Sequence, residues 1–288
     1  MSQQIETTSY YRATIPQLII IFIRYTITIP ILFLILYIKE NSIHVDFTLA
    51  HKKYLAAIGF IIVTVFQMGY MYGETYTTGT EASLLIATIP IAVFIISVSI
   101  LRYKITLRHV LGLLTGFLGV LLVILFETSS SKEATLGNLI IIIGVIGFAL
   151  YTVILKEFNN SFIDLEPNIR PSTLTILAWF SIFRMFFLAP LTFLLNPTYV
   201  SIHVFVAIPS RIWLGILYLG LFSSVLGVML FVEAIKLLDP NKDVIFTNLI
   251  PTVGIGLSTL LLGEKINLLI QIGALILIFI SIYLVNTK

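Results

Sequence analysis

The chain has 288 residues, of which 58 % are hydrophobic and 11 % are charged, with a net charge of +3 and no cysteine. Soluble domains carry roughly 25 % charged residues, so this composition excludes an ordinary soluble protein. The lack of cysteine excludes disulfides, thiolate metal sites and thiol nucleophiles. The basic residues flank apolar runs rather than forming a groove, which argues against a nucleic-acid-binding protein.

Nine long apolar runs follow one another along the chain and are separated by short polar connectors. They cover residues 16–38, 54–73, 82–101, 106–126, 137–155, 173–195, 212–236, 243–262 and 266–285. A helix needs about 20 apolar residues to cross a bilayer core of about 30 Å. The runs are longer than barrel strands and do not alternate. We therefore predict an all-α integral membrane protein with nine spans.

Two parts of the chain repeat each other without a gap at an offset of 161. The identical positions include the following pairs: Gly59 and Gly220, Met68 and Met229, Pro90 and Pro251, Ser97 and Ser258, Leu101 and Leu262. One register step away, the spacing of Arg24 and Pro30 recurs in Arg184 and Pro190. Doubled units of apolar spans are typical of transporters. We predict two repeats, residues 1–126 and 137–288.

The basic residues of the connectors predict the orientation. With the C-terminus in the cytoplasm, eleven basic residues face the cytoplasm and four face outward. The cytoplasmic ones are Lys39, Lys52, Lys53, Arg102, Lys104, Arg108, Lys156, Arg170, Lys236, Lys242 and Lys288. Such a bias sets the topology of short loops, so we expect a multi-pass cell-membrane protein with an outer N-terminus. An odd number of spans per repeat also inverts the second repeat relative to the first.

The order, spacing and duplication of these motifs resemble the EamA-type members of the drug/metabolite transporter superfamily. The resemblance covers about residues 16–287 and rests on segments such as "IFIRYTITIP", "FRMFFLAP" and "LLGEKINLLIQIGAL". It implies a fold of two inverted repeats with five spans each. Nine spans are predicted here, and the first of those ten has no counterpart in the sequence. Either the start of the gene is misassigned, or a nine-span form is genuine, in which we expect a partner helix or a second copy of the chain to replace the missing span.

Two arginines fall near the middle of predicted spans. Arg24 lies about nine residues into its run and Arg184 about twelve, which places both near the bilayer midplane. An arginine there costs about 2.5–3.5 kcal/mol on insertion scales, so it should face the protein interior or water. One interpretation is a cationic site for an acidic or zwitterionic substrate. The other is a pair of braces that bind neighbouring backbone carbonyls.

Two prolines in the middle of predicted spans indicate where a transport pathway runs. Pro90 and Pro251 each remove a backbone hydrogen bond and are expected to kink their helices. Freed carbonyls are tolerated in a membrane where they are buried or face a cavity. The resemblance implies that the neighbouring polar residues line a central cavity for a neutral polar or aromatic metabolite. These candidate substrate-binding residues are Tyr70, Tyr72, Thr88, Asn248 and Thr252, with Tyr76 less secure.

The other polar and small residues have plainer interpretations. Glu74 and Glu81 flank a predicted outer loop and are expected to be solvated. Glu233 lies inside a span, where it would bind an arginine, carry a coupling proton or, as we expect, reach the membrane interface. Gly112, Gly116 and Gly119 match the small-residue pattern of helix packing.

The sequence favours a transporter over an enzyme. Its four histidines are scattered and form no H-x-x-x-H pair, and no phosphate-binding loop is present, so we expect no catalytic residues, no metal and no cofactor. The predicted function is a secondary transporter or exporter of small polar, amino-acid-like metabolites that works by alternating access. A flippase of a lipid-linked intermediate is the alternative, followed by a membrane-embedded enzyme.

Overall fold

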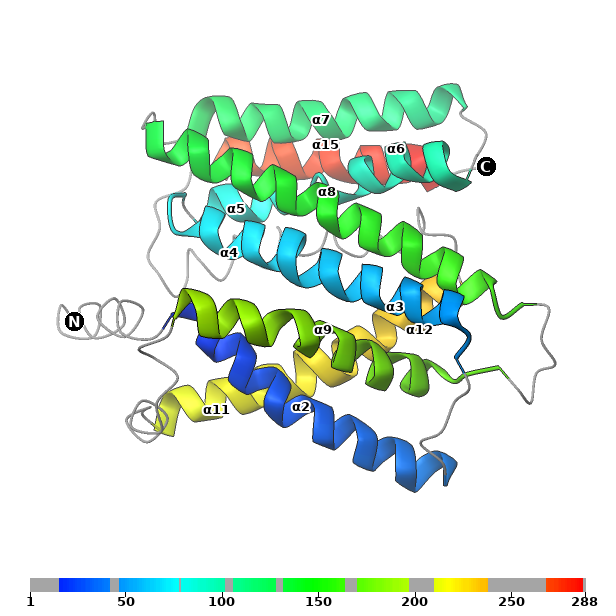
Figure 1. Ribbon diagram of the computed structural model, residues 1–288. Coiled ribbons are helices and arrows are strands. Elements are labelled where there is room, and N and C mark those ends of the chain that lie inside the picture. Colours follow the sequence, from blue (N-terminus) through cyan, green and yellow to red (C-terminus); the bar gives the residue numbers. More distant parts are fainter. Residues whose placement is uncertain are drawn as a thin grey trace. The chain divides into compact units, whose positions relative to one another are not determined.

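The computed structural model describes residues 16–41, 47–77, 79–101, 106–127, 132–163, 170–196, 210–237 and 268–286 (Figure 1). Within these ranges the regular elements are all helical. They are α2 Gln17–Glu40, α3 Leu49–Phe60, η1 Ile61–Gln67, α4 Met68–Glu74, α5 Gly79–Ile86, α6 Ile89–Leu101, α7 Leu107–Glu127, α8 Lys132–Asn160, α9 Thr173–Leu195, α11 Ser210–Tyr218, η3 Leu219–Gly227, α12 Val228–Leu237 and α15 Leu268–Asn286. Here η denotes a π-helix. The prediction of an all-helical membrane protein is confirmed.

Five helical stretches of the described residues are long and apolar enough to cross a membrane. They are Gln17–Glu40, Leu49–Glu74, Thr135–Asn160, Thr173–Leu195 and Ile212–Leu237. Each coincides with one of the nine predicted runs. Of the remaining four runs, two correspond to α7 and α15, one is divided between α5 and α6, and residues 243–262 lie outside the described residues.

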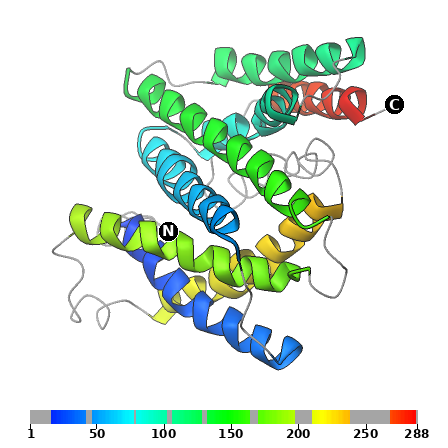
Figure 2. The ribbon, with the colours of Figure 1, turned by 45° about the vertical axis from the view of Figure 1, so that its right-hand side comes forward.

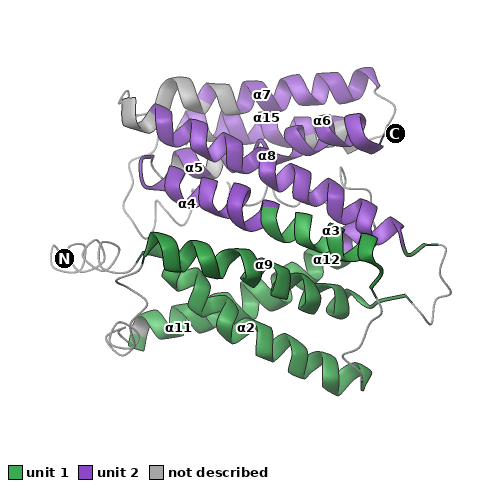
Figure 3. Cartoon of the chain, in the orientation of Figure 1, with its two compact units in different colours: residues 1–60, 162–233 green, residues 61–161, 234–288 purple. Residues whose placement is uncertain are grey.

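The chain forms two compact units, and each unit draws on both halves of the sequence (Figure 3). Unit 1 consists of residues 1–60 and 162–233, and unit 2 consists of residues 61–161 and 234–288. Neither unit coincides with one of the predicted halves, and the boundaries of the repeats stay a prediction.

Unit 1 is organised around the packing of α2 against α9. The N-terminus of α9 is capped by Ser172, whose hydroxyl oxygen accepts the N–H of Thr175 at 3.1 Å. Such a cap satisfies one of the four free N–H groups at a helix start. Leu32 and Leu36 of α2 are fully buried, and the ring of Phe33 meets Trp179 of α9 edge to face. Apolar contacts of this kind hold the two helices together.

Unit 2 contains a second pair of packed helices, α7 and α15, which lie side by side in two views of the chain (Figure 1, Figure 2). A methyl group added to Gly116 of α7 would lie 2.7 Å from the Ser281 hydroxyl of α15, and one on Gly119 would lie 3.0 Å from the Ala274 carbonyl. The predicted packing role of these two glycines is confirmed. Small residues let backbones approach where no hydrophobic effect drives association.

The two packed pairs join counterparts of the sequence repeat. At the offset of 161, α7 falls on residues 268–288, which contain α15, and Arg24 of α2 falls one step from Arg184 of α9. The π-helix η1 likewise falls on residues 222–228, which overlap η3. Single π turns recur at functional sites in helices. These correspondences support a duplicated fold.

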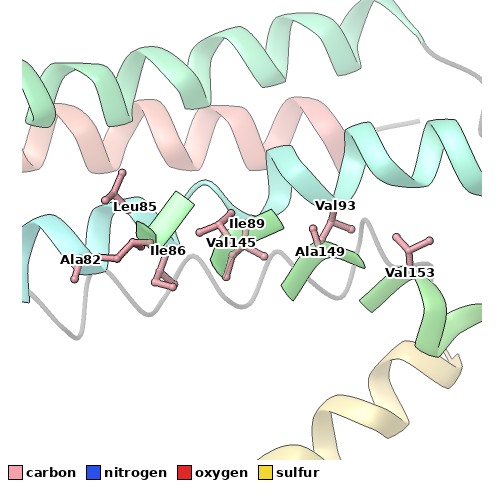
Figure 4. Packing of buried hydrophobic residues seen from close by; sticks show 9 residues of the cluster. Ala82, Leu85, Ile86, Ile89, Val93, Val145, Ala149 and Val153 are labelled. Atoms are coloured by element: carbon pink, nitrogen blue, oxygen red, sulfur yellow. The ribbon is translucent and has the colours of Figure 1, made fainter. Parts of the chain in front are cut away.

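A hydrophobic cluster in unit 2 joins α5 and α6 to α8 (Figure 4). Leu85, Ile86 and Ile89 pack against Val145 and Ala149, and all five are buried. The cluster extends over several turns of α8. Packing against α8 therefore fixes the positions of α5 and α6, in addition to the short connection between them.

The predicted single helix over residues 82–101, kinked at Pro90, is wrong. Helix α5 ends at Ile86 and α6 begins at Ile89, so Pro90 lies in the first turn of a new helix. Proline suits this position, since the first turn needs no N–H donor. The Thr88 carbonyl accepts the N–H groups of Ile91 and Ala92 at 3.0 and 3.1 Å, which starts α6. The result is a discontinuous helix rather than a kinked one.

Candidate functional site

The two predicted arginines meet around one buried aromatic ring in unit 1. The guanidinium carbon of Arg184 lies 4.4 Å from the centroid of the Tyr25 ring, and that of Arg24 lies 5.0 Å from the same centroid. Arg184 is only 6 % exposed, and Tyr25 is 1 % exposed. The Phe180 ring, one turn before Arg184 on α9, lies 5.0 Å from the Arg184 guanidinium. We call Arg24, Tyr25, Phe180 and Arg184 the arginine cluster.

The helices that carry this cluster are held in register by short contacts. The Thr28 hydroxyl donates to the Arg24 carbonyl at 2.8 Å and approaches the Gly220 carbonyl of η3 at 3.4 Å. A methyl group on Gly220 would lie 3.3 Å from that hydroxyl. The lack of a side chain at Gly220 therefore lets the π-helix η3 approach the backbone next to Arg24.

The guanidinium groups have few partners within the described residues. Nη2 of Arg24 donates to the Tyr25 hydroxyl at 3.3 Å, while Nε of Arg24 and Nε of Arg184 are buried without an acceptor. Among the residues that the structure describes, no hydrogen bond joins the side chain of Arg24 or Arg184 to a backbone carbonyl. The interpretation of the arginines as carbonyl-binding braces therefore gains no support from these contacts.

The carboxylates of unit 1 are engaged elsewhere. Among its described residues the acidic ones are Glu40 and Glu233. The hydroxyls of Ser172 and Thr175 donate to Glu40, the second at 2.9 Å, and the Thr173 hydroxyl donates to Glu233. All three donors lie at the start of α9, about 14–18 Å along the helix from Arg184 at 1.5 Å per residue. Negative charge is also favoured at a helix N-terminus.

The arginine cluster is therefore a buried group of donors short of acceptors. A cation over an aromatic face gains about 0.5–2 kcal/mol, which is less than the cost of about 2.5–3.5 kcal/mol for one arginine at the membrane centre. Two such charges share one tyrosine ring. Chemically, the arrangement suits a small anion that accepts hydrogen bonds from both guanidinium groups.

The other predicted substrate-binding residues divide into two sets. Asn248, Pro251 and Thr252 lie outside the described residues. Tyr70, Tyr72, Thr88 and Pro90 all belong to unit 2. Their grouping with the arginine cluster into one site stays a prediction.

Within unit 2, the structure brings Tyr70 but not Tyr72 to the broken helix. Tyr70 stacks on Phe66 with a centroid distance of 6.1 Å, and both pack against the hydrophobic cluster of α5, α6 and α8. Tyr72 is 42 % exposed, since two residues along a helix turn the side chain by about 200°. The Thr88 hydroxyl donates to the Leu85 carbonyl at 2.6 Å and so satisfies the end of α5.

One expectation about acidic residues is wrong. Glu81 is not a solvated loop residue: it is 4 % exposed and lies within hydrogen-bonding distance of Thr77 and Asn138. It lies in the first turn of α5, whose packing on α8 covers it. Glu233 accepts the Thr173 hydroxyl at the start of α9, and its expected place at the membrane interface stays a prediction. A hydroxyl on a neighbouring helix was the partner that the sequence did not reveal.

The roles of Tyr25 and of the glycines between α4 and α8 were not predicted from the sequence. Tyr25 directly follows Arg24, but a tyrosine inside a span carries no signal of its own. The sequence around Gly69 and Gly73 does contain a G-x-x-x-G pattern, which could have predicted close packing. A methyl group on Gly69 would lie 3.1 Å from the Gly144 Cα, and one on Gly73 would lie 2.8 Å from the Gly137 carbonyl.

Metal binding finds no support in the part of the chain that the structure describes. There, no group of three histidine or acidic side chains is placed to hold an ion. This observation does not test the expectation that the protein has no metal and no cofactor.

Comparison with known families gives two matches, which together cover most of the chain. Residues 7–125 and 135–287 each match the EamA-like transporter family. Among curated proteins, the chain is 30 % identical over 258 residues to the uncharacterized transporter YetK of Bacillus subtilis, with 87 % of this chain and 73 % of that protein covered. It is also 30 % identical over 224 residues to the uncharacterized transporter YyaM of the same organism, with 77 % and 69 % covered.

The chain is also similar to a more distant relative and to a solved structure. Protein PagO of Salmonella typhimurium is 24 % identical over 273 residues, which cover 93 % of this chain and 84 % of that protein. One solved crystal structure aligns with a TM-score of 0.70 at 16 % identity and covers 95 % of this chain and 89 % of its own. At that identity the likeness concerns the fold alone.

Proposed function

Because this chain belongs to the EamA-like transporter family and is a multi-pass membrane protein, we propose that it is a secondary transporter of small polar metabolites that carry a carboxylate. Amino-acid-like compounds are the substrates that we favour. The observation that carries this proposal is the arginine cluster, in which two guanidinium groups share the Tyr25 ring and have no described carboxylate partner.

The chemistry of guanidinium groups favours a carboxylate. An arginine offers N–H groups in a planar fork that matches both oxygens of a carboxylate, and such charged hydrogen bonds are about twice as strong as neutral ones. Burial of Arg184 strengthens the attraction, since little water competes for the charge. A substrate of this kind supplies the acceptors that the cluster lacks.

The proposed transport cycle is alternating access without ATP, with an outer N-terminus and a cytoplasmic C-terminus. Discontinuous helices line the substrate sites of many secondary transporters and move during the cycle. We assign that part to α5 and α6, which separate at Thr88 and Pro90. Tyr70, Tyr72, Asn248, Pro251 and Thr252 are proposed to contact the substrate along the pathway.

Uptake into proteoliposomes tests the proposal. A panel of radiolabelled amino acids is compared with the corresponding amino-acid amides, which keep the side chain but lack the carboxylate. We expect uptake of at least one amino acid and none of its amide. Uptake of both at the same rate would contradict a carboxylate site.

Conservative arginine variants separate substrate binding from a role in folding. Arg184→Lys keeps the charge but loses the planar fork, so uptake should fall about tenfold while the folded amount stays unchanged. Arg108→Lys is the matched control, because Arg108 is exposed on α7 and lies outside the arginine cluster. A loss of folded protein in Arg184→Lys, with normal uptake by what remains, would indicate a brace.

A flippase of a lipid-linked intermediate is distinguished in the same vesicles. If the protein is a flippase, it should accelerate the movement of a fluorescent lipid between the leaflets, and soluble amino acids should not enter the vesicles. That result would overturn the proposed substrate class and retain the family assignment.

A further inference from the structure

Two glycines that correspond to each other in the sequence repeat lie beside the two arginines of unit 1. The residue numbers of Gly59 and Gly220 differ by 161, and those of Arg24 and Arg184 differ by 160. Gly59 of α3 lies against the backbone at Arg184, while Gly220 of η3 lies next to Arg24. Each glycine of one repeat therefore meets the arginine of the other repeat.

The helices that form these two contacts are counterparts as well. Residues 49–60 of α3 fall on residues 210–221, which contain α11 and the start of η3. Helix α3 packs against α9, and η3 packs against α2. We call the contact at Gly59 the α3–α9 crossing and the contact at Gly220 the α2–η3 crossing. Both belong to unit 1, and they are two copies of one contact.

The two copies are packed to different degrees. A methyl group on Gly59 would lie 3.0 Å from the carbonyl carbon of Phe183, so the backbone of α9 would have to move. A methyl group on Gly220 would lie 3.3 Å from the Thr28 hydroxyl oxygen and 3.9 Å from the Arg24 carbonyl oxygen. The α3–α9 crossing is therefore closed in this structure, whereas the α2–η3 crossing is looser.

Two further differences follow the same order. Gly59 lies in a regular α-helix that changes to a π-helix only at Ile61, whereas Gly220 already lies inside η3. Arg184, at the closed crossing, is buried, whereas Arg24 is half-buried. Because packed contacts switch between discrete arrangements, we interpret the two copies as two conformations of the same contact.

We propose that Gly59 and Gly220 are positioning residues for the two arginines, and that the two crossings exchange their conformations during transport. This inference rests on the proposed alternating access and on the predicted inversion of the repeats. In transporters of this kind, one repeat moves against the other around a fixed substrate site. In the opposite state, Gly220 lies against the backbone of Ile23 and Arg24 as closely as Gly59 now lies against α9.

The exchange has a consequence for the arginine cluster. A closed crossing fixes the backbone of the arginine beside it, while a loose crossing leaves the backbone of the other arginine more room. In this structure the fixed arginine is Arg184, and in the opposite state it is Arg24. A carboxylate bound to both guanidinium groups is therefore held by one fixed arginine in either state.

Matched pairs of cysteines report the state of each crossing. The rings of Phe60 and Phe187 meet beside the α3–α9 crossing at a centroid distance of 5.4 Å. Their counterparts in the repeat are Leu221 and Ile27, beside the α2–η3 crossing. The chain has no cysteine, so two double variants can be made without background: Phe60→Cys with Phe187→Cys, and Ile27→Cys with Leu221→Cys. The rate of cross-linking by a short bifunctional thiol reagent is measured for each pair in the full-length protein.

Alanine at either glycine tests the exchange without any substrate. Gly59→Ala forces the α3–α9 crossing apart, so we expect its cysteine pair to cross-link several-fold more slowly and the α2–η3 pair several-fold faster. Gly220→Ala should have the reverse effect, because its methyl group fits the loose contact better than the closed one. Gly215→Ala is the control and should change neither rate, since nothing lies within 4 Å of its added methyl group.

The cysteine pair that is distant from the substitution decides the outcome. A purely local effect of the methyl group would slow the nearer pair and leave the distant pair unchanged, and that result would overturn the proposal. Changes of both pairs in the same direction would also overturn it. If Gly59→Ala fails to fold, Gly220→Ala decides the test alone, because the nearest atom to its methyl group is a side-chain hydroxyl oxygen at 3.3 Å.

Uptake of the radiolabelled amino-acid panel into proteoliposomes separates this inference from the proposed function. We expect both alanine variants to keep the rise in melting temperature that a bound amino acid causes, and to take it up several-fold more slowly, since each variant favours one state. Wild-type uptake by both variants would overturn the role of the crossings in transport. If no panel member enters at all, the proposed substrate class fails, and the cross-linking still decides whether the two crossings exchange.

Discussion

The two compact units bury charge in opposite ways. In unit 1, Arg24 and Arg184 lie over the Tyr25 ring, and the Nε atoms of both are buried without an acceptor among the described residues. In unit 2, the buried Glu81 lies within hydrogen-bonding distance of Thr77 and Asn138. The first cluster has donors to offer a ligand, whereas the acidic side chain of the second has polar partners within the protein.

This difference predicts opposite responses to mutation in the two clusters. Buried donors without acceptors are costly in the empty protein, and a bound substrate with acceptors would offset that cost. Hydrogen-bonded polar side chains instead stabilise the empty protein. Removing one member of each cluster should therefore change stability with opposite signs.

The largest expected effect belongs to Arg184. Arg184→Met removes a buried charge and keeps a long apolar side chain, so carboxylate binding should weaken about 10–100-fold through the loss of charged hydrogen bonds. The free energy of unfolding should rise by about 1–2 kcal/mol, because the burial cost exceeds the lost cation–π attraction. Urea denaturation in detergent measures the second effect. A strong loss of stability would mean that the cluster is already satisfied.

Unit 2 should respond to Glu81→Ala with the opposite sign. Alanine leaves the half-buried Thr77 and Asn138 with one contact missing on each, which should lower the free energy of unfolding by about 1–3 kcal/mol. Glu81→Gln keeps the shape of the side chain and its ability to form hydrogen bonds, so it should lose less stability than Glu81→Ala. Thermal unfolding of both variants checks this order. Equal losses for alanine and glutamine would mean that these hydrogen bonds do not contribute to stability.

A smaller effect is expected where α8 approaches the end of α4 closely. A methyl group on Gly137, next to Asn138, would lie 2.8 Å from the Gly73 carbonyl and from the Tyr76 Cβ. Gly137→Ala should therefore push α8 away from the turn that carries Thr77 and cost about 1–3 kcal/mol, partly offset by about 1 kcal/mol of helix propensity. Gly215→Ala is the control, since nothing lies within 4 Å of its added methyl group. A stabilised Gly137→Ala protein would contradict the packing argument.

The smallest effect is expected at the start of α9, where the carboxylates of unit 1 are bound. Ser172→Ala removes the cap of Thr175 and a donor to Glu40 and should cost about 1 kcal/mol. Carboxylate binding at the arginine cluster should be unchanged, because the cap lies about 18 Å away along the helix. Weakened carboxylate binding in this variant would mean that the start of α9 and the arginine cluster are coupled, which would contradict this prediction.

Most of the fold could be predicted from the sequence because apolar runs of span length leave few alternatives. The break before Pro90 could not, since a mid-helix proline and a first-turn proline look alike in a run of apolar residues. What decided between them was the hydrogen bonding of Thr88, which starts a new helix.

The candidate site was predicted only in part. The sequence placed Arg24 and Arg184 near the membrane midplane, and the repeat paired them. It gave no sign that both would meet at Tyr25, because contacts between α2 and α9 depend on the rotation of each helix. Glu81 was misjudged for a similar reason, since its partner Asn138 lies 57 residues away on α8.

Ligand-dependent stability measures the arginine cluster most directly. The melting temperature of the purified wild type and of Arg184→Met is recorded with each amino acid of the panel and with its amide, at equal concentrations. An amino acid that binds the folded wild type should raise its melting temperature, its amide should not, and neither should act on Arg184→Met. An equal rise with the amide, or a rise that survives in Arg184→Met, would contradict carboxylate binding by the arginine cluster.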